Sequence, residues 1–134
     1  MARYDFLNLN YLGELEEDCV NRAIALALGE DYLTIKRKLE LVSELMECDK
    51  LCVCCYKFLL DEVYDLERIE EYAGLTIEEF SHHRPKGTYL IRVDNHLTTM
   101  IDSVVYDIWD CREETVRIIW KVEKNKFFRW LFKF

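Results

Sequence analysis

Apolar residues recur at helical spacing through the first part of the chain. Between Asp18 and Gly29 they are Val20, Ala23, Ile24, Ala27 and Leu28, which would share one face of a helix. Asp18 is a favoured N-cap residue and Gly29 a favoured helix stop, so the pattern predicts a buried helix that opens with Cys19. The same spacing predicts two further helices, over about 31–48 and 50–72.

The pattern changes from helix to strand near residue 81. Thr76 and Glu79 form a capping box, which predicts a short helix closed by Phe80. After a loop at 81–86, alternating apolar residues predict strands over 88–93, 96–101, 104–106 and 115–122, with turns at 94–95 and 102–103. Residues 1–17 show no regular period. Because helices come first and antiparallel strands second, we expect an α+β domain.

The composition narrows the possible functions. A chain of 134 residues, 51% of them hydrophobic, suits one folded domain, which we place at 1–123. The net charge of −8 argues against a general nucleic-acid binder. The first residues lack the apolar core of a signal peptide, and no apolar run is long enough to span a bilayer. We therefore expect a cytoplasmic protein whose six cysteines are reduced thiols rather than a disulfide framework.

The C-terminal tail, 124–134, is both basic and aromatic. Three interpretations remain open for it. The tail packs on the domain's own core, it contacts a partner or a second copy of the chain, or it lies on an anionic membrane surface. Eleven residues are too few to cross a bilayer.

Cys19 is the first candidate for chemistry. The N-terminus of a helix carries partial positive charge and unpaired N–H groups, which favour a thiolate over a thiol. A cysteine at that position suits a nucleophile, but it equally suits a small apolar residue that fills the core.

A cysteine nucleophile needs a base, and the base needs a group that orients it. His96 is expected at the start of a strand, where it is better positioned than His82 and His83 in a loop. A hairpin that turns at 102–103 would bring His96 close to Asp107. The alternatives are a histidine that is merely satisfied at a strand end and an aspartate that serves a turn, which applies to Asp110 as well.

A second group of cysteines lies in the predicted third helix and just before it. Cys48, Cys52 and Cys55 would share one helix face, with Cys54 beside them. Thiolates of this kind bind zinc, but structural sites usually draw ligands from separate segments. Buried apolar thiols are therefore the favoured interpretation, Cys111 is expected to be structural, and no metal or cofactor is predicted.

Four blocks of sequence carry a family resemblance. They are Asn8-Leu9-Asn10 with Gly13 and Asp18-Cys19-Val20-Asn21-Arg22-Ala23; Pro85-Lys86-Gly87-Thr88-Tyr89-Leu90-Ile91; Asn95-His96-Leu97-Thr98; and Val105-Tyr106-Asp107-Ile108-Trp109-Asp110-Cys111. Through them the chain resembles small papain-like cysteine peptidase-type proteins of bacteriophages and prophages. The middle of the chain, about 40–75, matches poorly. The chain also has Asp102-Ser103 where the family usually has a glycine after the aspartate, and Ile108 in place of a threonine.

The resemblance implies a papain-like fold with a catalytic triad. Cys19 would be the nucleophile, His96 the general base and then acid, and Asp107 the orienting acid, with Asp110 as the alternative. The helix that bears the cysteine would pack on the antiparallel sheet that delivers the histidine.

An amide side chain upstream of the cysteine commonly completes the oxyanion hole in such enzymes. Asn10 is the candidate for that role and Asn8 the second choice.

The implied activity is a cysteine hydrolase that acts on an amide or peptide bond of a peptide or protein substrate through a thioester. The alternative is a non-catalytic phage protein of the same fold that binds a host protein. In either case the resemblance implies the cytoplasm of a host cell.

Overall fold

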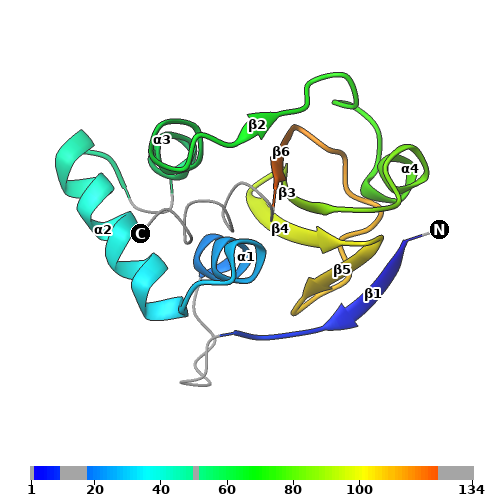
Figure 1. Ribbon diagram of the computed structural model, residues 1–134, viewed down its shortest axis with the longest axis horizontal. Helices are drawn as coiled ribbons and strands as arrows, with labels where there is room; N and C mark the ends of the chain where they lie inside the picture. The colour runs from blue at the N-terminus through cyan, green and yellow to red at the C-terminus, as the bar shows by residue number, and fades with distance from the viewer. Residues whose placement is uncertain (1, 10–17, 50–51, 124–134) are drawn as a thin grey trace.

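The computed structural model describes residues 2–9, 18–49 and 52–123. These residues form an α+β structure, as the pattern predicted, with four α-helices and a six-stranded mixed sheet (Figure 1). The elements in chain order are β1 (Arg3–Phe6), α1 (Cys19–Leu28), α2 (Tyr32–Met46), α3 (Val53–Phe58), the π-helical turn η1 (Leu59–Val63), β2 (Glu67–Arg68), α4 (Ile77–His83), β3 (Thr88–Val93), β4 (His96–Ile101), β5 (Val104–Asp107) and β6 (Ile118–Val122).

The strands lie in the order β1-β5-β4-β3-β6-β2. β1 runs parallel to β5, and the other neighbouring pairs are antiparallel. The β4–β5 hairpin turns where the sequence predicted, at Asp102 and Ser103, whose φ angles are 48° and 65°. Positive φ at both central residues is what a tight hairpin requires, and it explains why glycine suits this turn. Here Asp102 also accepts a hydrogen bond from the Gly87 N–H at 2.9 Å.

Helices cover both faces of the sheet. α1 lies between the sheet and α2, and α4 lies on the far side (Figure 1). On β3, Leu90 belongs to the core shared with α1, α2 and α3, whereas its neighbour Ile91 belongs to the core shared with α4. Because successive strand residues point to opposite faces, a strand covered on both sides is apolar throughout. This arrangement explains why five of the six residues of β3 are buried.

The predicted helix over 50–72 is wrong beyond Val63. The chain leaves the helix through η1, where the Tyr64 N–H donates to the Leu59 carbonyl, and Asp65 adopts a φ of 51°. β2 then adds to the edge of the sheet beside β6.

The side chain of Asp61 explains this departure from the helical pattern. It accepts hydrogen bonds from Arg68 at 2.6 Å and from the indole N–H of Trp120 at 2.8 Å. These bonds tie the helix end to β2 and β6. Leu66 and Ile69, which match a helix face in sequence, pack against different cores.

Three smaller predictions are corrected. Residues 3–6, expected to be irregular, form β1, an edge strand whose Phe6 is exposed and which therefore shows no alternation. The capping box of Thr76 is present, but α4 continues past Phe80, so His82 and His83 are helical. The last strand begins at Ile118 instead of Thr115.

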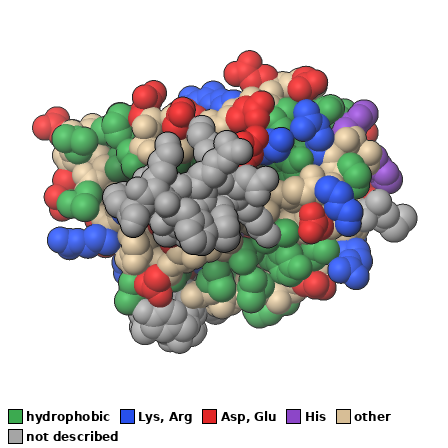
Figure 2. Space-filling model, viewed as in Figure 1, with side chains coloured by type: hydrophobic (Ala, Val, Ile, Leu, Met, Phe, Trp, Pro, Cys, Tyr) green, Lys and Arg blue, Asp and Glu red, His purple; other side chains and the backbone are tan. Residues whose placement is uncertain are grey.

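Charges of both signs are interspersed among the described side chains on the face shown in Figure 2. In the described ranges no helix has the length and apolarity needed to cross a membrane. The interpretations of the tail at 124–134 lie outside the described residues.

Candidate active site

Cys19 opens α1, and Asp18 is the N-cap residue as predicted. The Asp18 side chain makes no capping hydrogen bond. It forms an ion pair with Arg22 one turn later and accepts a hydrogen bond from the Tyr32 hydroxyl at 2.7 Å. The first intrahelical bond runs from the Arg22 N–H to the Asp18 carbonyl. The N–H of Cys19 therefore has no acceptor within the helix and is available to a ligand.

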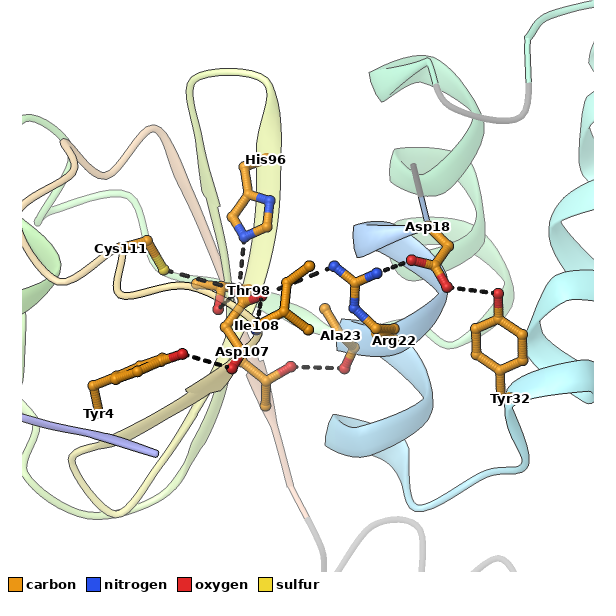
Figure 3. Close-up of polar contacts among 11 residues, drawn as sticks. Tyr4, Asp18, Arg22, Ala23, Tyr32, His96, Thr98, Asp107, Ile108 and Cys111 are labelled. Carbon is orange, nitrogen blue, oxygen red and sulfur yellow. Dashed lines mark hydrogen bonds and ion pairs between the residues drawn. The ribbon is translucent and has the colours of Figure 1, made fainter. Parts of the chain in front are cut away.

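His96 opens β4 and lies against Asp107 at the end of β5 (Figure 3). Its Nε2 is 2.6 Å from Oδ2 of Asp107. The same oxygen accepts a hydrogen bond from the Thr98 hydroxyl at 2.6 Å, and Oδ1 accepts one from the Ile108 N–H at 2.7 Å. His96 and Thr98 are two residues apart on one strand, so both face this carboxylate. Contacts to both carboxylate oxygens therefore fix the position of Asp107.

Cys19 and His96 line one cleft, and the His96 ring and the Leu97 backbone lie near enough to the Cys19 thiol to lower its pKa. Because Nε2 of His96 is engaged by Asp107, Nδ1 is the nitrogen left for the thiol. The structure therefore brings together Cys19, His96 and Asp107, the three residues that the sequence singled out as a triad.

The electrostatics of the group favour charge separation. Burial raises the pKa of the Cys19 thiol, but the hydrogen bonds from His96 and Leu97 and the positive charge of His96 outweigh it, so the pKa lies below its ordinary value. Burial lowers the pKa of His96, yet its hydrogen bonds to Asp107, Cys111 and Cys19 raise it to about 11. Burial likewise raises the pKa of Asp107, but the hydrogen bond and charge of His96, together with the hydrogen bonds from Thr98 and the Ile108 N–H, bring it below its ordinary value. Together these shifts favour a thiolate beside an imidazolium.

Arg22 links this group to the start of α1. Its guanidinium is buried between two carboxylates, paired with Asp18 and 3.9 Å from Oδ1 of Asp107 (Figure 3). Two acidic neighbours offset the cost of a buried cation. The Tyr4 hydroxyl donates to the Asp107 carbonyl at 3.1 Å, so β1 also braces the end of β5.

A cleft of about 440 Å³ opens beside the sulfur. Cys19 and His96 line it together with Tyr56, Arg92, Asn95 and Trp109. The Trp109 ring lies over His96, with 5.0 Å between ring centroids. Cys19 is partly exposed, so a substrate in this cleft has access to the thiol.

The acid in contact with His96 is Asp107 and not the alternative, Asp110. Asp110, the alternative acid, is exposed and binds Arg112 through both of its oxygens, at 2.9 and 2.7 Å. Asn10 falls outside the described residues, and Asn8 is partly buried just after β1. The ring of His83 on α4 stacks on Tyr72.

The remaining cysteines do not assemble a zinc site. Cys52 and Cys54 are exposed, with their sulfurs 3.1 Å apart, while Cys55 is buried and donates to the Leu39 carbonyl. In the part of the chain that the structure describes, the one group of metal-ligand type is His96, Asp107 and Cys111. The 2.6 Å contact between Nε2 and Oδ2 is too short for two ligands of one ion, since each would lie about 2.0–2.2 Å from zinc at a wide angle.

Sequence reasoning missed several residues of the site. Thr98 could have been predicted, because it follows His96 by two positions on a strand and therefore faces the same side of the sheet. Arg22 could also have been predicted, because it follows Asp18 by four positions on a helix. The ring of Trp109 and the backbone of Leu97 are brought in by tertiary packing alone.

Comparisons of the chain with protein-family models, with curated proteins and with solved structures find no match. The site is therefore interpreted from its own geometry and chemistry.

Proposed function

We propose that the protein is a cysteine hydrolase that cleaves an amide or peptide bond through Cys19, His96 and Asp107. The observation that carries the proposal is the pairing of a thiol of lowered pKa with a histidine whose pKa is raised to about 11, beside an open cleft. Such a pair supplies the nucleophile and the proton donor together.

The proposed fold is papain-like. Two features of the described residues support it: the helix that bears the cysteine packs on the sheet, and a strand of that sheet supplies the histidine. The family resemblance of the four sequence blocks points the same way, toward a phage or prophage protein that acts in the host cytoplasm.

In the proposed reaction the Cys19 thiolate attacks the carbonyl carbon and a C–S bond forms. The N–H of Cys19 hydrogen-bonds the resulting oxyanion, with Asn10 as the proposed second donor. His96 gives its Nδ1 proton to the leaving nitrogen as the C–N bond breaks, which leaves a thioester. A water molecule, deprotonated by His96, then attacks the thioester; the acid departs and the thiolate–imidazolium pair is restored.

Asp107 stays ionised throughout this cycle. Its contact with Nε2 fixes the orientation of the ring and stabilises the imidazolium, while Thr98 and the Ile108 N–H hold the carboxylate in place.

Selective alkylation tests this proposal. At about pH 6 ordinary thiols are almost entirely protonated, so iodoacetamide should modify Cys19 before the more exposed Cys52 and Cys54. Peptide mass spectrometry of native protein measures the order. Cys55 serves as an internal standard for a buried inert thiol, because burial is the main cause that raises its pKa to about 12.

His96→Ala should abolish the preference for Cys19, whereas His82→Ala, at an exposed histidine on α4, should leave it intact. Equal labelling of Cys19 and Cys52, or a preference that survives in His96→Ala, would argue for the non-catalytic binding protein instead.

A further inference from the structure

The cleft beside Cys19 contains a cation that the proposed mechanism does not use. Arg92 lies on β3, where it pairs in register with Leu97, the residue after His96. Its side chain lines the same cleft as Cys19 and His96. A substrate that occupies this cleft can therefore contact both Cys19 and Arg92.

The other charged groups around the cleft are paired. Asp18 is matched by Arg22, and His96 by Asp107. Arg92 forms no ion pair with any residue that the structure describes.

Neither of two polar neighbours, Asp94 and Tyr56, balances the charge of Arg92. Asp94, two residues along the strand, is held by Arg117 through both oxygens, at 3.0 and 3.2 Å. Tyr56 also lines the cleft, but burial raises its pKa to about 12 despite the nearby charge of Arg92, which keeps the phenol neutral.

The guanidinium is also incompletely hydrogen-bonded. Nε of Arg92 is buried and has no hydrogen-bond partner. Arg92 is only partly exposed, and a substrate that displaces cleft water would raise the free energy of its charge unless the substrate supplies the opposite charge. Carboxylates match the planar fork of a guanidinium.

We propose that Arg92 binds a carboxylate of the substrate, so that the enzyme acts on acidic peptides or acyl compounds with that carboxylate close to the scissile bond. This inference rests on the proposed function, since it places the substrate at Cys19. An aspartate or glutamate side chain and a free C-terminal carboxylate offer the same chemistry to Arg92.

Two alkylating agents that differ in charge test the inference without knowledge of the substrate. Iodoacetate carries a carboxylate and iodoacetamide is neutral. In the wild type, the ratio of the iodoacetate rate to the iodoacetamide rate should be higher at Cys19 than at the exposed Cys52 of the same molecule. Arg92→Gln should lower the ratio at Cys19 by about ten-fold, the effect of one charge at close range in a partly buried site.

The matched variants separate charge from fold. Arg92→Lys retains the cation and should keep most of the wild-type ratio. Arg37→Gln makes the same substitution at an exposed arginine of α2 and should leave the ratio unchanged. A ratio at Cys19 that is equal in the wild type and Arg92→Gln, while iodoacetamide still prefers Cys19, would overturn the inference alone. Loss of that preference in the wild type would instead overturn the proposed function.

Protection of Cys19 from iodoacetamide distinguishes the two sources of carboxylate. The probes are three short peptides: one with an internal glutamate and an amidated C-terminus, one with glutamine and a free C-terminus, and one with glutamine and an amidated C-terminus. At least one acidic peptide should protect the wild type, and the protection should be lost in Arg92→Gln. Equal protection by the neutral peptide would contradict the inference.

Discussion

At the scale of single residues, Asp107 determines the chemistry of the site. One carboxylate accepts hydrogen bonds from His96, from Thr98 and from the Ile108 N–H, and it stabilises the positive charge of the ring. That charge in turn favours the Cys19 thiolate. The charge of Asp107 by itself raises the pKa of Cys19, so its stabilising effect on the thiolate acts through His96.

Asp107→Asn should therefore slow alkylation of Cys19 most strongly in acid. Without the carboxylate the pKa of His96 falls and that of Cys19 rises, and a rise of one unit reduces the thiolate fraction about ten-fold below the pKa. We expect a loss of about ten-fold or more near pH 6 that shrinks toward pH 9, where any thiol ionises. The rate of iodoacetamide modification as a function of pH measures it.

The matched control is Asp110→Asn. Asp110 is exposed, binds Arg112 and lies outside the site, so its variant should follow the wild-type profile. A loss in Asp107→Asn that is equal at every pH would mean that the variant damages the fold instead of the ionisation of the thiol.

At the scale of elements, the sequence predicted helices and strands accurately where several local signals coincide. α1 has its predicted bounds, α2 differs by one or two residues, and the β3, β4 and β5 strands and their turns are close to those expected. The signals failed where long-range contacts decide the structure. β1 needs β5 beside it, and the end of η1 is fixed by bonds from Asp61 to Arg68 and Trp120.

α4 covers the face of the sheet opposite α1. A substitution that destabilises α4 should therefore leave the reactivity of Cys19 unchanged. Thr76→Ala removes the hydroxyl of the capping box, which accepts a hydrogen bond from the Glu79 N–H at 3.1 Å. The free energy of unfolding should fall by about 1 kcal/mol. Urea unfolding measures this change, while alkylation of Cys19 near pH 6 should keep its wild-type rate. A matching loss of thiol reactivity would show that α4 and the site are coupled.

At the scale of the whole molecule, packing brings the thiol and the imidazole together. Cys19 and His96 lie far apart in sequence, and they share one cleft because α1 packs against the sheet. The Thr99 hydroxyl of β4 donates to the Ala23 carbonyl of α1 at 2.7 Å and sets this position. The sequence predicted which residues would meet. It did not predict a role for Arg92, because only the folded structure shows that Arg92 lines the cleft and that its neighbour Asp94 is already paired with Arg117.

The central claim is that Cys19 is ionised by His96, and titration of the thiolate tests it most directly. Ultraviolet absorbance of the wild type minus that of Cys19→Ser, followed against pH, isolates this one sulfur. The account predicts a midpoint below the pKa of an ordinary thiol, about 8.5, and an upward shift of that midpoint in His96→Ala. A midpoint at or above that ordinary value, or one that is the same with and without the imidazole, would contradict it.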